Sequence, residues 1–177
     1  MEIEIQSTSL INQPKKLIQY VNTVMSPKEI EKKTYGEVFT PLKLVDQMLN
    51  RLNNTYKTLN DDESIFSNPT LKWYDPANGI GNFAIILFYR LMSGLKSIIP
   101  NDQKRKQHIL EQMIYVSELN PANNHLYKTI MNANRQYKLN INEGDSLKLD
   151  IKEKWGIDKF DVVIGNPPYN NSFKNNG

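Results

Sequence analysis

Residues 71–92 have the sequence LKWYDPANGIGNFAIILFYRLM, and this stretch decides the fold because its character changes twice. Residues 71–74 favour a short strand, residues 75–82 a turn with two glycines, and the apolar run 83–92 a buried helix. In open α/β sheets, ligands bind at the carboxyl ends of strands, where such a turn lies, and glycine lets the backbone approach them. We therefore predict a strand–turn–helix unit that contacts a ligand; on this stretch alone, a tight turn without a ligand is the alternative.

The alternation of strands and helices continues on both sides of this stretch. The other predicted elements are strands at 113–116, 139–141 and 160–164, helices at 14–25, from Ser26-Pro27, at 42–52 after the cap signal Thr40-Pro41, from a cap at Asp102 and at 120–133, and a surface loop at 53–70. Such alternation, with apolar strand cores, predicts an α/β fold with a doubly wound, mostly parallel sheet. About the first four strands of that sheet are expected here, preceded by N-terminal helices.

The composition excludes several classes of site. The chain has 177 residues, a formal net charge of +3 and no cysteine, so disulfides, zinc–cysteine sites and a cysteine nucleophile are excluded. No apolar run approaches the roughly 18 residues that cross a bilayer, and the N-terminus lacks the apolar segment of a secretory signal. We therefore expect an intracellular (cytoplasmic) protein. The charge permits nucleic-acid contact without requiring it, and we interpret the basic run 104–106 as a solvated helix face.

Three acids end predicted strands. Asp75, directly before the glycine turn, suits a ligand with a cationic amine rather than a pyrophosphate. Glu118 can accept hydrogen bonds from two ribose hydroxyls, or it is a solvated strand-end acid; it lies further from the glycine turn than the roughly 20 residues usual in such folds. Asp145 can accept a hydrogen bond from an adenine amino group, or it is a helix cap or turn acid.

The segment Gly165-Asn166-Pro167-Pro168-Tyr169 follows the fourth predicted strand. Two consecutive prolines cannot continue a ladder, so the chain must leave the sheet at its ligand edge. The amide oxygen of Asn166 and the carbonyl of Pro167 can accept both hydrogens of one NH2 group, and Tyr169 offers a flat face for a planar ring. The alternative is a proline-rich exit turn without a substrate.

These motifs resemble those of the N6-adenine DNA methyltransferases of restriction-modification systems. The likeness is carried by Asn166-Pro167-Pro168-Tyr169 after an apolar strand, by the turn from Asp75 to Gly81, and by Phe39-Thr40-Pro41 upstream. Their order resembles the subgroup whose target recognition domain lies at the C-terminal end. Asn78 and Ile80 depart from the family pattern, which more often has smaller residues there.

The resemblance implies a Rossmann-like fold, S-adenosyl-L-methionine as cofactor, double-stranded DNA as substrate, and no metal. The cofactor-binding residues that it implies are Phe39, Thr40, Pro41, Asp75, Ala77, Gly79, Gly81, Asn82, Glu118 and Asp145. Asp75 and Gly79 would lie against the methionine part, with Phe39 and Thr40 beside it, and Glu118 on the ribose. The catalytic residues would be Asn166, Pro167, Pro168 and Tyr169; Asp145, Asn166 and Tyr169 would meet a flipped-out adenine.

The resemblance also divides the chain. We expect an N-terminal arm with helices at 1–34 and the N-terminal part of a catalytic domain at 35–177, without the later strands and the target recognition domain. A C-terminal region or a second chain would supply the rest of the sheet, and the chain alone would methylate DNA negligibly. The alternatives are a glutamine or RNA methyltransferase, which also carries Asn-Pro-Pro-Tyr, and a catalytically silent binding module that needs a second chain. Cytosine C5 methylation is excluded because it needs a cysteine nucleophile.

Overall fold

The computed structural model describes residues 10–24, 39–132 and 134–168. Its helices are α1 (Pro14–Val24), α3 (Leu42–Leu59), α4 (Asn82–Gly94), α5 (Asp102–His108), α6 (Pro121–Asn132) and α7 (Ile151–Trp155). Its strands are β1 (Trp73–Asp75), β2 (Ile114–Ser117), β3 (Asn140–Asn142) and β4 (Val162–Val163). Short helical turns complete the elements: η1 (Leu10–Asn12), η2 (Ile65–Ser67), the π-helical η3 (Ile109–Met113) and η4 (Ser146–Lys148). The helix expected from Ser26 lies outside the described residues.

The four strands form one parallel sheet in the order β3-β2-β1-β4. The chain first moves from β1 through β2 to β3 and then returns to place β4 on the other side of β1. The strand order therefore reverses between β1 and β4, and open α/β sheets bind ligands at the carboxyl ends of strands at this point. The predicted doubly wound parallel sheet is confirmed, and its strand order is that of a Rossmann-like fold.

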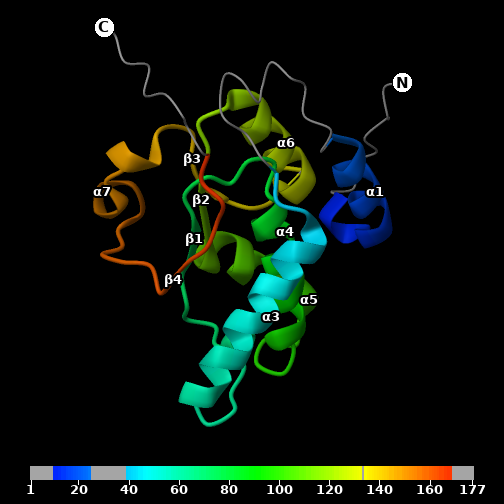
Figure 1. Cartoon of the computed structure of the whole chain (residues 1–177), viewed down its shortest axis with the longest axis vertical. Helices are drawn as coiled ribbons and strands as arrows, with labels where there is room; N and C mark the ends of the chain where they lie inside the picture. Colours follow the sequence, from blue (N-terminus) through cyan, green and yellow to red (C-terminus); the bar gives the residue numbers. More distant parts are fainter. Residues whose placement is uncertain (1–9, 25–38, 133, 169–177) are drawn as a thin grey trace, which may run out of the picture.

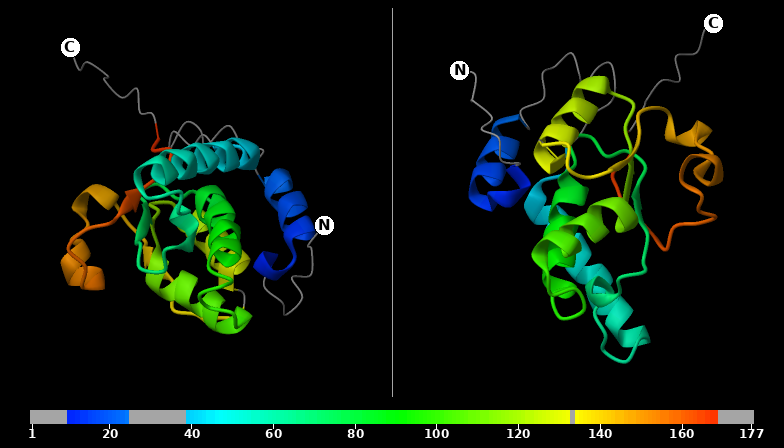
Figure 2. Two further views of the ribbon diagram at one scale, coloured as in Figure 1. Left: turned by 90° about the horizontal axis from the view of Figure 1, so that it is seen from below. Right: turned by 180° about the vertical axis from the view of Figure 1, so that it is seen from behind.

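The sheet lies between two unequal layers. Helices α3, α4, α5 and α6 lie on one side and the short α7 on the other (Figure 1; Figure 2 shows the same separation from below). Strand β1 and strand β2 are buried along their whole length. Because α4 is apolar on nearly every face, it packs into the centre of the thick layer, as its sequence predicts.

Aromatic side chains cover the face of the sheet that α7 flanks. Tyr74 and Tyr115 are neighbours across β1 and β2, so their side chains project to the same face. Phe160 stacks on Tyr74 with ring centroids 4.4 Å apart, and Trp155 of α7 meets Tyr115 edge-on at 5.2 Å. These rings bury large apolar areas where only one short helix covers the sheet.

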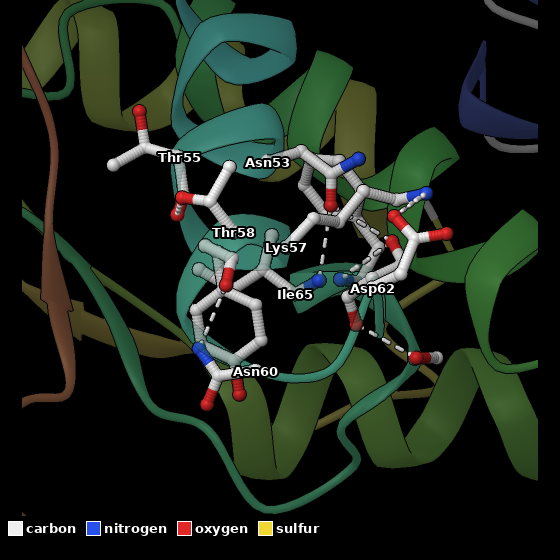
Figure 3. A network of polar contacts seen from close by, with 11 residues as sticks. Asn53, Thr55, Lys57, Thr58, Asn60, Asp62 and Ile65 are labelled. Atoms are coloured by element: carbon white, nitrogen blue, oxygen red, sulfur yellow. Dashed lines mark hydrogen bonds and ion pairs between the residues drawn. The ribbon is translucent and has the colours of Figure 1, made fainter.

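The predicted loop at 53–70 is wrong in its first part, because α3 continues to Leu59. Asn53, on the last turns of this helix, holds the returning chain: its Oδ1 accepts from Ser64 Oγ at 2.9 Å and from the Ile65 amide at 3.0 Å (Figure 3). Lys57 donates to Asp62 at 3.3 Å in the same network. Polar residues that suggest a loop are here the hydrogen-bonding groups of a helix end and its turn.

Two further predictions, for the fourth strand and for the basic run, are wrong in part. The fourth strand is shorter than 160–164, because Phe160 turns onto Tyr74 and the Asp161 side chain accepts from the Lys72 amide at 2.7 Å. Nor is β4 buried on both faces: Val163 is 62% exposed. The basic run 104–106 is not entirely a solvated face, because Arg105 is buried and donates to the carbonyls of Ile99 and Pro100, at 2.6 and 3.1 Å.

The helix caps also differ from two predictions. Asn101, not Asp102, caps α5, since its side chain accepts from the Lys104 amide. Thr40 was expected to cap α3, but Pro41 occupies the cap position and no side chain caps that helix. The Thr40 side chain is therefore left available for another role.

Candidate functional site

A cavity of about 520 Å³ opens at the carboxyl ends of the strands. It lies where the strand order reverses, so the structure places a cavity where the sequence predicts one. The residues that line it are Phe39, Thr40, Pro76, Ala77, Asn78, Gly79, Asn82, Phe83, Glu118, Leu119, Gly144, Asp145, Ser146, Leu147, Asn166, Pro167 and Pro168. Segments that are far apart in the sequence therefore meet around one space.

Most of the predicted site residues line this cavity. They are Phe39, Thr40, Ala77, Gly79, Asn82, Glu118, Asp145, Asn166, Pro167 and Pro168. Pro41, Asp75 and Gly81 were also expected to contact the cofactor, but the structure does not place them on the cavity wall. Tyr169 and residues 35–38 lie outside the described residues.

The two glycines of the turn have different roles. Gly79 has φ +56°, and a Cβ there would lie 3.1 Å from Cε1 of Phe39, so the Phe39 ring packs directly over the turn. Gly81 has φ +99°, and a Cβ there would lie 2.5 Å from Cδ2 of Tyr127 in α6. Gly81 therefore allows α4 and α6 to approach each other and does not face the cavity, whereas Gly79 does.

Glu118 ties the end of β2 to its neighbours. Its Oε2 accepts from the Gly79 amide and its Oε1 from the Asn120 amide, both at 2.7 Å. Its own amide donates to the Asn142 carbonyl at 3.0 Å. The side chain is buried, so the alternative of a solvated strand-end acid is wrong. A carboxylate oxygen has two lone pairs, and a fixed carboxylate at the cavity wall can still accept hydrogen bonds from a ligand.

Asp75 lies behind the cavity wall. It is 4% exposed, and its Oδ1 accepts from the Ala77 amide at 3.0 Å, while its Oδ2 has no hydrogen-bond partner among the described residues. Burial raises the pKa of Asp75 to about 7; the Ala77 amide opposes this shift and the Glu118 carboxylate adds to it. A direct contact with the cofactor is not what this geometry indicates, because Oδ1 faces Gly165 instead.

A hydrogen bond from a side chain of α4 holds residues 39–40 next to the glycine turn. Asn82 Nδ2 donates to the Thr40 carbonyl at 2.8 Å and thereby fixes the segment at the start of α4. Thr40 is buried, and within the described ranges its Oγ1 has no hydrogen-bond partner. Pro41 begins α3 at this point and turns away from the cavity.

Asp145 is both a cap and a wall residue. Its Oδ1 accepts from the Leu147 amide at 3.0 Å and so caps η4, which is the alternative role predicted for it. Its Oδ2 lies 3.8 Å from Lys148 Nζ. The carboxylate nevertheless borders the cavity, so capping fixes its orientation and does not remove it from the site.

Asn166, Pro167 and Pro168 reach the cavity because β4 pairs with β1 up to this point. The Ile164 amide donates to the Tyr74 carbonyl at 2.9 Å, and the ladder ends there. The two prolines then leave the sheet, as the sequence predicts, and Asn166 lines the cavity together with them.

Several wall residues were not predicted: Pro76, Asn78, Phe83, Leu119, Gly144, Ser146 and Leu147. Each is a sequence neighbour of a predicted residue, which is the only signal that could have found them. Leu119 and Leu147 stand out because they are apolar yet 61% and 94% exposed. Apolar side chains at the mouth of a cavity are typical of sites that bind ligands with apolar surface.

Two other features, a metal-binding cluster and a membrane-spanning helix, are absent from the described part of the chain. No group of three or more His, Asp or Glu side chains there could hold a metal ion. None of the helices described is both long and apolar enough to span a bilayer.

Comparison with known proteins gives a family match. A family model described as N-6 DNA Methylase matches residues 21–177. An uncharacterized adenine-specific methylase from Mycoplasma pneumoniae is 38% identical over 79 residues, which are 45% of this chain and 17% of that protein.

Two solved structures share the fold. One is a modification subunit of a putative type I restriction enzyme from Vibrio vulnificus YJ016, with a TM-score of 0.60 and 20% identity over 89% of this chain and 29% of that one. The other is the ATP-dependent type ISP restriction-modification enzyme LlaBIII bound to DNA, with a TM-score of 0.57 and 16% identity over 93% of this chain and 12% of that one. The chain thus spans less than a third of the length of each of these proteins.

Proposed function

Because this chain belongs to the N-6 DNA methylase family, we propose that its cavity binds S-adenosyl-L-methionine and that it serves methyl transfer to the N6 amino group of adenine in DNA. The observation that carries the proposal is the meeting of the glycine turn, Glu118 and the Asn-Pro-Pro segment around one cavity. A cofactor and a base must touch for methyl transfer, and these are the three segments that would hold them.

The cavity suits the cofactor in size and chemistry. Its volume of about 520 Å³ lies within the roughly 300–1,000 Å³ of small-molecule sites. Glu118 would accept hydrogen bonds from the ribose hydroxyls, and Leu119 and Leu147 would cover the faces of the purine. Thr40 Oγ1 is a buried polar atom without a partner in the described structure, and a ligand with polar groups at its amino-acid end would satisfy it.

The cofactor supplies an electrophilic methyl group on a sulfonium, and the protein must prepare the nucleophile. The lone pair of the adenine amino group is delocalised into the ring. Asn166 Oδ1 and the Pro167 carbonyl would accept its two hydrogens, which favours a pyramidal nitrogen whose lone pair points at the methyl group. This is orientation plus electrostatic stabilisation, without a covalent enzyme intermediate.

The adenine must leave the duplex to reach this site, since base-modifying enzymes act on flipped or single-stranded bases. Asp145 borders the same cavity and would bind the base or the purine of the cofactor. Tyr169 would stack on the flipped base. A glutamine or RNA substrate is less well supported, because the matching family model describes DNA methylases.

The remaining parts of a working enzyme would come from outside this unit. The exposed β4 edge pairs only with β1 within the described residues, and unpaired strand edges favour further pairing. We propose that later strands, from a C-terminal region or a second chain, pair there and that DNA recognition is supplied with them. Action on DNA would place the protein in the cytoplasm, at the nucleoid.

The test has two stages. Calorimetry first measures S-adenosylmethionine binding to the chain, for which we expect a single site. Transfer of a labelled methyl group to adenine-containing DNA is then measured with the longest natural reading frame. Binding without any transfer to adenine, but with transfer to RNA or to a glutamine peptide, would overturn the proposed substrate; absence of binding would overturn the proposed cofactor.

A further inference from the structure

Asn78 is a buried residue of the cavity wall whose side-chain amide makes few hydrogen bonds. Its backbone is well bonded, since its amide donates to the Ser117 carbonyl and its carbonyl accepts from the Gly81 amide, both at 2.9 Å. Its side-chain Nδ2 reaches only the Gly79 carbonyl, at 3.5 Å, and its Oδ1 has no hydrogen-bond partner in the described structure. Asn78 is 4% exposed and lines the cavity.

Such a side chain destabilises the folded state unless a ligand supplies the missing hydrogen-bond partner. A buried amide whose oxygen has no hydrogen-bond partner destabilises the folded state, and a smaller apolar residue at this point would avoid that cost. The turn itself does not need the amide, because the hydrogen bonds that shape it are made by backbone atoms. The side chain is therefore better explained by a group that enters the cavity than by the fold.

The surroundings of Asn78 favour a positively charged group. Glu118 lines the same cavity, and its Oε2 accepts from the amide of Gly79, the residue next to Asn78. Phe39 packs over Gly79, which places the Thr40 segment on the same side of the cavity. The Glu118 carboxylate and two partnerless side-chain oxygens, of Asn78 and Thr40, favour a donor with several N–H groups and a positive charge.

We propose that Asn78 Oδ1 accepts a hydrogen bond from the α-ammonium group of the cofactor's methionine part, with Thr40 Oγ1 as a second acceptor. This inference rests on the proposed function, because it names the end of the cofactor that this part of the wall binds. Asn78 would then bind the amino-acid end of the ligand and make no contact with its nucleoside end.

The test compares ligands that differ at that end. S-Adenosylmethionine and S-adenosylhomocysteine both carry the ammonium, whereas 5′-methylthioadenosine lacks the whole amino-acid part. For Asn78→Ala we expect calorimetry to show about a ten- to hundred-fold loss of affinity for the first two, as for a hydrogen bond to a charged group. Affinity for 5′-methylthioadenosine should be unchanged.

Melting temperatures of the ligand-free proteins separate binding from folding. We expect ligand-free Asn78→Ala to melt no lower than the wild type, because the substitution removes an unsatisfied buried group. Asn50→Ala, at an exposed helix position, is the matched control and should match the wild type for all three ligands. Should Asn78→Ala fail to fold, Asn78→Ser, which keeps a shorter polar group, is measured with the same ligands.

The outcomes distinguish the two proposals. If the wild-type chain binds none of the three ligands, the proposed function fails and this inference fails with it. If the wild type binds but the Asn78 variant loses affinity for all three ligands equally, or for none, the cofactor assignment stands and the role of Asn78 is overturned.

Discussion

The carboxylate of Asp75 lies directly against the backbone of Gly165, so that a Cβ at position 165 would be 2.4 Å from Oδ1. Asp75 ends β1, whereas Gly165 lies two residues beyond the end of the neighbouring β4 and immediately precedes Asn166. A buried acid of the glycine turn therefore supports the segment that would hold the substrate. Asp75 is therefore a positioning residue for the segment that contains Asn166.

Gly165→Ala should displace Asn166. The Asp75 carboxylate cannot yield easily, because it is buried and held by the Ala77 amide. We expect a loss of about 1–3 kcal/mol in the free energy of unfolding, measured by urea denaturation. Gly144→Ala is the control for stability, since the nearest atom to its Cβ would be 3.9 Å away. Equal stability of the two variants would show that the segment can move freely.

Asp75→Asn should change how stability depends on pH. Burial raises the pKa of Asp75 from 3.8 to about 7, so between these pH values the folded state holds a proton that the unfolded state has lost. The contribution of Asp75 to stability is therefore fully present below pH 4 and is lost as pH rises through 7. Asparagine keeps an acceptor for the Ala77 amide without this titration.

We expect Asp75→Asn to gain stability relative to the wild type between pH 5 and pH 8, by about 2–3 kcal/mol. Denaturation at both pH values measures the difference, and subtraction cancels groups that titrate in both proteins. Asp62→Asn, at an exposed turn, is measured in the same way as the matched control substitution. A constant difference between Asp75→Asn and the wild type would mean that Asp75 does not titrate in this range.

Glu118→Gln should lower the affinity of the chain for every ligand that contains ribose. The carboxylate accepts from two backbone amides, and glutamine can accept from only one of them in the same position. We expect a loss of about 1–3 kcal/mol of stability and parallel losses of affinity for S-adenosylmethionine and 5′-methylthioadenosine. This pattern differs from that expected for Asn78→Ala.

Calorimetry and denaturation check the Glu118 prediction. Glu143→Gln is the control, because Glu143 is exposed and pairs only with Lys128 among the described residues. Such a surface pair contributes about 0–1 kcal/mol. If 5′-methylthioadenosine bound Glu118→Gln as tightly as the wild type, Glu118 would not hold the ribose.

Asn166→Ala should separate turnover from cofactor binding. In the complete enzyme we expect turnover to fall by about 10²–10³, the usual loss of one preorganised polar group, while S-adenosylmethionine affinity stays the same. Single-turnover methylation and calorimetry on the same samples provide the two readouts. Asn54→Ala, at an exposed position of α3, is the control. A parallel loss of both quantities would place Asn166 on the cofactor instead.

The sequence by itself determined the order of strands and helices, the fold class and the main segments of the site. Periodicity, glycine and proline are local signals, so the turn at 75–82, the start of α6 at Pro121 and the departure of the chain at Pro167 could be predicted. The positions of Gly79, Glu118 and Asn166 on one wall follow from strand ends that meet at the same edge of a parallel sheet.

Only the tertiary structure decided which of these residues face the cavity. Asp75 lies behind the wall because Gly165, 90 positions later and just beyond β4, approaches it, and Gly81 contacts α6 because Tyr127 lies over it. The same kind of contact, between residues distant in sequence, shortens β4, because Phe160 stacks on Tyr74. Local sequence patterns specify which backbone conformation forms, but the direction that a side chain faces depends on the element that packs against it.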